Sequence, residues 1–380
     1  MKTKYFTAIA LLSIGLSFIP STPVKLVGSE NNTKHTEFSI GRPAITKIQL
    51  ALLLDTSNSM DGLINQAKNQ LWETISHLSK ETPDAKIEIA IYQYGNDNLS
   101  VYNNYVQKVL DFSSNLDEVS SKLFKLQTNG GSEYCGAVIH NAQKDLNWDD
   151  GIKTKRVMVI AGNEPFNQGN TSYATSIASS VKKNIQVNTI FCGNHNTGIS
   201  NKWKEGAVLG NGQYFSIDQN NDVRQIATPY DDKILSCNKK INKTYVPVYE
   251  VDEEEQAEMV ENDKEQAVAQ KERLVEKALI KKNKTVYNKS SWDAIDNYVS
   301  NGKDVSKMKS ANKGSLNSRF ANKSDKEIEK EILVIKTERD SLHLELTNLE
   351  ALRLKFIREN QNSDSDKKTL GYNLVQSILK

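Results

Sequence analysis

Three oxygen-bearing side chains at alternate positions stand at the end of the apolar run over residues 48–55. They are Asp55, Ser57 and Ser59, in the sequence D-T-S-N-S. Mg²⁺ is a hard cation that requires six oxygen ligands in a near-octahedral arrangement. One carboxylate and two hydroxyls on a single tight turn can occupy one face of that octahedron. Because hydroxyls are neutral, we expect such a site to leave the metal under-neutralised and ready to attract an anionic ligand from outside.

A second loop is expected to complete this site. Residues 126–136 read L-Q-T-N-G-G-S-E-Y-C-G, in which the paired glycines allow a close approach of the backbone and Ser132 offers a hydroxyl. Thr128 is an alternative donor. Ser132 also has a structural interpretation of equal weight, as the N-cap of the helix that follows. The predicted ligand set is therefore Asp55, Ser57, Ser59 and Ser132, with Mg²⁺ as the ion and Mn²⁺ or Ca²⁺ as alternatives.

The elements that position these side chains follow from the pattern of apolar residues. Between residues 46 and 232, nearly continuous apolar runs alternate with segments of helical period, which is typical of a parallel sheet covered on both faces. The predicted fold class is α/β, a doubly wound, mostly parallel sheet, in which ligands bind beyond the carboxyl ends of the strands. Strands are predicted at 48–55, 86–94, 155–161, 186–192 and 213–217, and helices at 63–78, 116–126, 135–146, 173–183 and near Trp203.

The amino terminus is typical of an export signal. Lys2 and Lys4 precede an apolar run over residues 5–19, which is short for a membrane span. We interpret residues 1–29 as a signal peptide, with an uncleaved signal anchor in the membrane as the alternative. The protein is therefore expected in the periplasm, in the cell envelope or outside the cell.

The three cysteines are too few for a disulfide scaffold. Cys135 and Cys192 both fall at the predicted carboxyl edge of the sheet, where a bridge between them would brace the site. Export makes such a bridge chemically reasonable. Buried free thiols are the alternative, and Cys237 is expected to be one.

The predicted sheet domain spans residues 45–247. A helical, partly coiled-coil-like region is predicted over 248–380. A charged helix is expected over 252–284 and a polar linker over 300–324. A clear helix follows, with an apolar stripe that we expect to pack on another helix of this region or on a second copy of the chain. The stripe comprises Ile328, Ile332, Ile335, Leu342, Leu346, Leu349 and Phe356, interrupted by Arg339 and Arg353.

Several function classes are disfavoured by composition and motifs. A formal net charge of +2 gives no chain-wide field that would attract nucleic acid. The chain has no G-x-G-x-x-G after the first strand and no Walker sequence, so it shows no nucleotide site. His140 and His195 do not form a catalytic or zinc-binding pair with another residue. Two-metal hydrolysis requires a carboxylate cluster, and besides Asp55 the site loops carry only Glu133 and Glu164.

The D-T-S-N-S turn and the second loop resemble the von Willebrand factor A family. Its metal-ion-dependent adhesion site combines D-x-S-x-S with a Thr from a later loop and an Asp from a third. The resemblance implies that Asp55, Ser57 and Ser59 form the first element and Ser132 the second. In the third loop, where the family commonly reads T-D-G-E-P, this chain reads A-G-N-E-P over 161–165, so Gly162 takes the Asp position.

This departure leaves two alternatives for the predicted site. Either the metal lacks that anion and binds more weakly, or Asn163 or Glu164 stands in for it. Within this family, the chain most resembles a group of uncharacterised exported bacterial proteins that contain the domain. The similar segments are residues 61–72, 161–169 and 227–235. The chain's Y-N-K-S-S-W-D segment at 287–293 is part of the same resemblance.

The resemblance implies a binding module rather than an enzyme. A protein partner would supply an Asp or Glu carboxylate to the open position of the metal. A different class of function is the alternative: a structural envelope protein with a degenerate metal site that self-associates through the 328–356 stripe.

Overall fold

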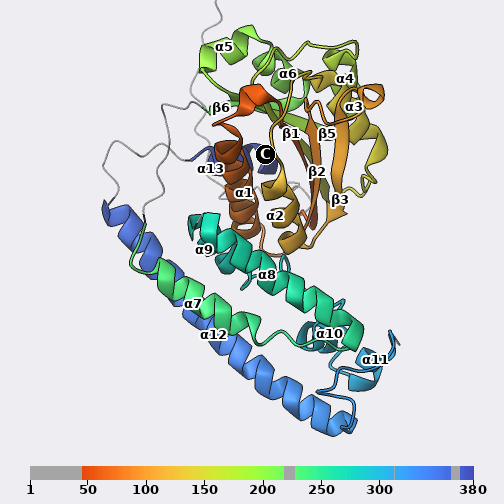
Figure 1. Cartoon of the computed structure of the whole chain (residues 1–380), viewed down its shortest axis with the longest axis vertical. Helices are drawn as coiled ribbons and strands as arrows, with labels where there is room; N and C mark the ends of the chain where they lie inside the picture. Colours follow the sequence, from red (N-terminus) through yellow and green to blue (C-terminus); the bar gives the residue numbers. More distant parts are fainter. Residues whose placement is uncertain (1–44, 218–226, 270, 312, 361–368) are drawn as a thin grey trace, which may run out of the picture. The chain divides into compact units, whose positions relative to one another are not determined.

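A sheet with buried, apolar central strands forms the framework of the amino-terminal half (Figure 1). The computed structural model describes residues 45–217, 227–269, 271–311, 313–360 and 369–380. The six strands lie in the order β3-β2-β1-β4-β5-β6. All are parallel to their neighbours except β3, which runs antiparallel to β2. The strands are β1 (Lys47–Asp55), β2 (Lys86–Tyr94), β3 (Val106–Ser113), β4 (Thr154–Gly162), β5 (Ile185–Cys192) and β6 (Asn211–Ile217).

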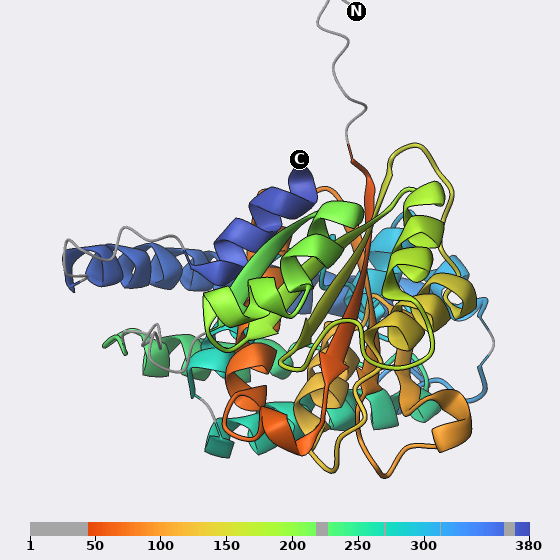
Figure 2. The same ribbon diagram turned by 90° about the horizontal axis from the view of Figure 1, so that it is seen from above.

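Helices cover both faces of this sheet because the central strands are apolar on both sides (Figure 2). Every residue of β1 after Lys47 is buried. One face packs on α1 (Ile64–Glu81), α2 (Leu116–Lys125) and the carboxyl-terminal α13 (Leu370–Leu379). The opposite face packs on α3 (Cys135–Asp145), α4 (Tyr173–Lys182) and α6 (Trp203–Leu209), and a short α5 (His195–Ser200) lies beyond β5. The doubly wound α/β prediction is confirmed.

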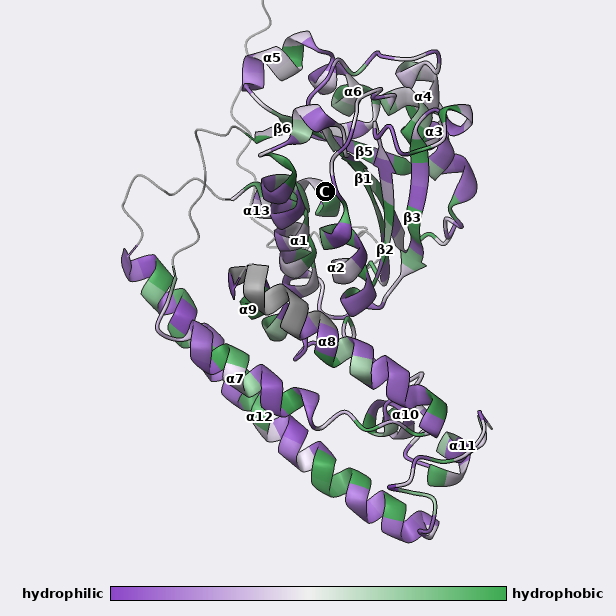
Figure 3. Ribbon diagram, in the orientation of Figure 1, coloured by the Kyte–Doolittle hydropathy of each residue, from purple (hydrophilic) through white to green (hydrophobic). Residues whose placement is uncertain are grey.

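The carboxyl-terminal region folds back on the chain. Its helices are α7 (Asp231–Asn242), α8 (Glu253–Ala269), α9 (Lys271–Ile280), α10 (Ala294–Ser300), α11 (Val305–Lys309) and α12 (Asp325–Asn360). Figure 3 shows that apolar residues dominate the strands, whereas α12 mixes apolar and polar residues along its length. Two groups of buried residues on α12 pack inside the chain. Ile328, Ile332 and Ile335 join Val248, Tyr298 and Phe320, while Leu342, Leu346 and Leu349 join Ile234 and Leu279.

The predicted linker over 300–324 is wrong. Met308 and Phe320 are fully buried, and the backbone amide of Asn317 donates to the carbonyl of Val248. This segment contains α11 and packs against the first half of α12. Its few apolar residues are scattered among Lys, Asn and Ser, so composition alone conceals that they share one cluster.

The charged residues that interrupt the apolar stripe of α12 are also buried. Arg339 makes a two-pronged ion pair with Asp293, at 2.8 and 2.9 Å, and its guanidinium lies 4.0 Å from the ring centroid of Tyr245. Arg353 bonds Asp231 at 3.1 Å and Glu276 at 3.0 Å. These arginines therefore fix α12 against the chain's own helices.

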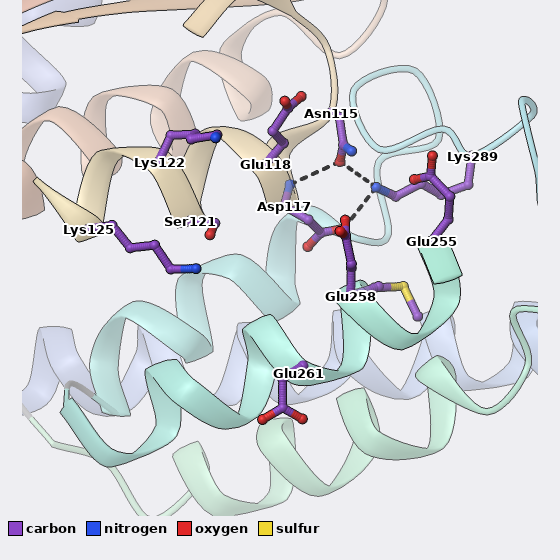
Figure 4. A pocket seen from close by; sticks show the side chains of 11 residues that line it. Asn115, Asp117, Glu118, Ser121, Lys122, Lys125, Glu255, Glu258, Glu261 and Lys289 are labelled. Carbon is purple, nitrogen blue, oxygen red and sulfur yellow. Dashed lines mark hydrogen bonds and ion pairs between the residues drawn. The ribbon is translucent and has the colours of Figure 1, made fainter. Parts of the chain in front are cut away.

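A buried charge junction ties the sheet domain to the helical region. Asp117, at the first turn of α2, lies 2.7 Å from the Nζ atom of Lys277 on α9 and 2.8 Å from that of Lys289. The hydroxyl of Tyr287 donates to the same carboxylate at 2.5 Å. Figure 4 shows Asn115, Asp117 and Lys289 converging beside a polar cavity between α2 and α8. Burial alone would raise the pKa of Asp117, but the lysines outweigh it and hold that pKa far below its ordinary value.

The predicted signal segment, residues 1–29, lies outside the described residues. Among the helices that the structure does describe, none has both the length and the apolar content needed to cross a bilayer.

The charge junction generates a stability prediction. Lys277→Met removes the cation between the buried Asp117 and the half-buried Asp263, which lie 2.7 and 2.9 Å from it, and leaves both carboxylates short of a partner. We expect the free energy of unfolding in urea to fall by about 3–5 kcal/mol. Lys355→Met is the matched control, because its ion pair with Glu359 is exposed and should contribute less than about 1 kcal/mol. Equal losses in the two variants would contradict the prediction.

Candidate metal site

The D-T-S-N-S turn brings its three oxygen-bearing side chains together where β1 ends. Asp55 is fully buried, and its Oδ1 atom accepts a hydrogen bond of 2.8 Å from the backbone amide of Ser57. The hydroxyl oxygens of Ser57 and Ser59 lie 2.9 Å apart. The turn passes into a short 3-10 helix over Asn58–Met60. The structure therefore brings these three predicted ligands together.

One oxygen of this cluster has no partner. Asp55 Oδ2 is buried and accepts no hydrogen bond within the described residues. Burial raises the pKa of Asp55 to about 7. A buried carboxylate oxygen without a donor is costly, and a bound cation is one way to satisfy it. The donor set of one carboxylate and two hydroxyls fits a hard divalent metal ion.

The third loop reaches the cluster through Asn163. The hydroxyl of Ser59 donates to Asn163 Oδ1 at 2.8 Å, and Asn163 Nδ2 donates to the carbonyl of Ser59 at 2.7 Å. The recorded hydrogen bonds of Glu164 go to other residues: its carboxylate accepts from Gln168 at 3.5 Å, and its carbonyl accepts from the indole of Trp203 at 2.7 Å. Of the two residues considered as stand-ins for the missing Asp, Asn163 is the one that contacts a predicted ligand.

Gly162 has no room for a side chain. A Cβ atom at this position would lie 2.5 Å from the hydroxyl oxygen of Tyr94 and 3.0 Å from both Cβ and Oδ2 of Asp55. The backbone of β4 therefore passes directly over the Asp55 carboxylate. This close approach is a physical reason why the chain has no acidic side chain at the position where the family pattern places one.

The second loop docks on the first through backbone contacts. The amide of Asn58 donates to the carbonyl of Gly130 at 2.6 Å, and the amide of Asn129 donates to the carbonyl of Thr56 at 2.9 Å. Gly130 has a φ of +66°, and a Cβ there would overlap the carboxylate of Asp97. Glycine is thus required at 130 for both conformation and space.

The side chains of this loop lie differently from the sequence-based interpretation. Thr128, the alternative donor, bonds Asp61 instead of the cluster. Ser132 is half-buried in the loop and stays a predicted ligand. Its interpretation as an N-cap is wrong, because α3 begins at Cys135 and Tyr134 occupies the cap position. The next residue, Glu133, is buried, and a Cβ atom built on Gly131 would lie 2.8 Å from its Oε1 atom and 3.9 Å from the Ser57 side chain.

The remaining candidates lie outside the cluster. All three cysteines are free and buried, so the predicted bridge between Cys135 and Cys192 is not formed. Cys135 instead lies 3.7 Å from the hydroxyl of Tyr94. His195 is exposed at the rim and pairs with Ser216. Within the described part of the chain, no group of three or more His, Cys, Asp or Glu residues is arranged to hold a metal ion.

Residues 49–228 match the family model described as the von Willebrand factor type A domain. This segment is a von Willebrand factor type A domain. Domains of this family often bind protein partners through a divalent metal. No curated protein sequence matches the chain.

Solved structures of other von Willebrand factor type A proteins are similar to the chain. The SpRpn10 domain is 14% identical with a TM-score of 0.37, covering 46% of this chain and 90% of that one. BatB from Bacteroides thetaiotaomicron is 16% identical with a TM-score of 0.35, covering 45% and 90%. Proximal thread matrix protein 1 of the mussel byssus, with zinc in its MIDAS motif, is 12% identical with a TM-score of 0.36, covering 47% and 43%. The match thus spans less than half of the mussel protein.

The contact above Asp55 generates a second prediction. Gly162→Ala should lower the free energy of unfolding by about 1–3 kcal/mol, because the new methyl group overpacks against Tyr94 and Asp55. The measurement is urea unfolding of the single variants and of Gly162→Ala combined with Tyr94→Phe. Since the Tyr94 hydroxyl oxygen is the nearest atom, its removal should recover part of the loss. Strictly additive losses would show that the crowding lies elsewhere.

Proposed function

We propose that this domain binds a divalent metal ion, Mg²⁺ in the first place, through Asp55, Ser57, Ser59 and Ser132. The observation that carries the proposal is the buried, unpartnered Oδ2 atom of Asp55 beside two mutually bonded hydroxyls. Mn²⁺ and Ca²⁺ are the alternative ions, since both accept oxygen ligands. When bound, the metal would supply a Lewis-acidic position that holds an oxygen ligand from another molecule. Asn163 would hold Ser59 in place from the neighbouring loop.

The partner in this proposal is a protein that presents an Asp or Glu carboxylate to the metal. The role in this proposal is binding and not catalysis, because domains of this family are typically interaction modules. Export to the periplasm, the cell envelope or the outside of the cell would place the domain where adhesion to other proteins is useful. The export signal predicted over residues 1–29 supports this location.

The structure offers little support for self-association as the alternative function. The α12 stripe that would drive it is buried against helices of the same chain. Phe356, near the end of the stripe, is half-buried and contacts the ring of Tyr230. We therefore propose the binding function alone.

Isothermal titration with MgCl₂ and MnCl₂ tests the metal. We expect saturable binding to the full chain and its loss in Asp55→Ala, because the only carboxylate of the D-T-S-N-S turn is removed. Asp145→Ala is the control: this exposed carboxylate ends α3, the helix that follows the second loop, one helix length from that loop. Equal binding by wild type and Asp55→Ala, with circular dichroism showing both folded, would reject the proposal.

Pull-down from the cell-envelope fraction tests the partner. Immobilised wild-type protein should retain a protein in the presence of Mg²⁺ and release it on addition of EDTA, because the metal bridges the two. Asp55→Ala should retain none of it under either condition, and Asp145→Ala should behave as wild type. A protein retained equally with Mg²⁺ and with EDTA would show that binding does not depend on the metal.

A further inference from the structure

Glu133 lies in the second loop, directly after Ser132, but is not among the predicted ligands. We propose that its carboxylate is a further ligand of the metal, so that the ion is held between two buried carboxylates of this chain, Asp55 and Glu133. The inference rests on the metal site proposed above and extends it by one residue. It assigns to Glu133 a role that neither the sequence pattern nor the family model specifies.

The first support is geometric. The side chains of Glu133 and Ser57, one of the predicted ligands, both lie against Gly131. A Cβ atom built on Gly95 would lie 2.9 Å from both Asp55 Oδ1 and Glu133 Cγ, so these two side chains meet on either side of that glycine. A Cβ on Gly131 would lie 2.8 Å from Glu133 Oε1 and 3.9 Å from the Ser57 side chain. The Glu133 carboxylate therefore turns back over Gly131 towards Ser57.

The second support is a contrast in how the chain treats its buried acids. Seven Asp and Glu side chains are buried among the described residues. Five of these acids have a Lys or Arg partner within 3.2 Å, whereas Asp55 and Glu133 have none. The paired ones are Asp117 with Lys277, Asp231 with Arg353, Asp252 with Lys313, Asp293 with Arg339 and Glu350 with Lys282. The two exceptions are neighbours, and only 6% of Glu133 is exposed.

Two adjacent buried carboxylates repel one another and lack solvation, so the pair is costly without a cation. A single side-chain ammonium could neutralise one of them, but a divalent ion balances both charges. Its hardness also suits the hydroxyls of Ser57 and Ser59. The unpartnered Oδ2 atom of Asp55 provides the free oxygen at which such an ion can bind.

Glu133 also explains how the site functions without an acid in the third loop. Gly162 leaves no space for one, so the second negative charge comes from the second loop instead. A site with two carboxylates holds its metal before any partner arrives. The attraction for an outside carboxylate is then weaker than in a site with one.

The experiment compares the full-length wild type with Glu133→Gln by Mn²⁺ titration calorimetry and by thermal unfolding with and without Mn²⁺. We expect Glu133→Gln to weaken Mn²⁺ binding by about tenfold or more, and to reduce the rise in Tm that Mn²⁺ produces. The Tm without metal should stay the same or increase, because the variant relieves repulsion with Asp55. Glu133→Asp keeps the charge on a shorter side chain and should retain part of the affinity.

Glu164→Gln is the matched control, because it removes a carboxylate from the neighbouring loop that faces Gln168 and not Ser57. It should bind Mn²⁺ as wild type does, and an equal loss of affinity in both Gln variants would overturn the proposal by showing a general field effect. Tight binding by Glu133→Gln overturns the role of Glu133 while the metal site stands. No binding by wild type overturns both. If Glu133→Gln does not fold, undiminished affinity in folded Glu133→Asp overturns it.

Discussion

The cost of a buried, unpaired carboxylate is the constraint that organises this molecule. Each acidic side chain that the helical region buries is paired with a base, as in the two-pronged contact of Arg339 with Asp293. Asp55, at the end of β1, is the contrary case, with one oxygen that accepts nothing within the described residues. Since the buried acids of the helical region are paired, this exception is the place where we propose that a cation binds.

The sheet creates this exception through its close packing. β1 is buried on both faces, so its last residue enters the loop region without access to solvent. Neighbouring strands pass so close to Asp55 that Gly95 and Gly162 cannot bear side chains. The same crowding that orients the carboxylate therefore removes the space in which a lysine or arginine could approach it.

The sequence predicted the framework of the fold because periodicity is a local property. The five parallel strands and the helices between them lie within a few residues of their expected positions. β3 was missed: it lies at the sheet edge, where half-exposed polar residues break the apolar pattern. α7 was missed as well, and the 300–324 linker was misinterpreted, since their burial depends on contacts with α12 that no short window of sequence reveals.

In the candidate site, too, contacts within one turn follow from the sequence, whereas contacts between distant loops do not. Asp55, Ser57 and Ser59 share one turn, so their convergence follows from spacing alone. Asn163 and Glu133 approach that turn from loops about 75 to 105 residues away along the chain, and their contacts depend on how the loops dock.

The glycine at position 162, where the family pattern has an Asp, changes which loop carries the negative charge near Asp55. A pattern that counts acids by position sees one charge lost in the third loop, whereas the folded chain shows a buried acid on the second. Electrostatics depends on distance in space and not on position in a motif, so charge lost from one loop can be supplied by another. A metal site is therefore better judged by the total charge around its buried oxygens than by agreement with a motif.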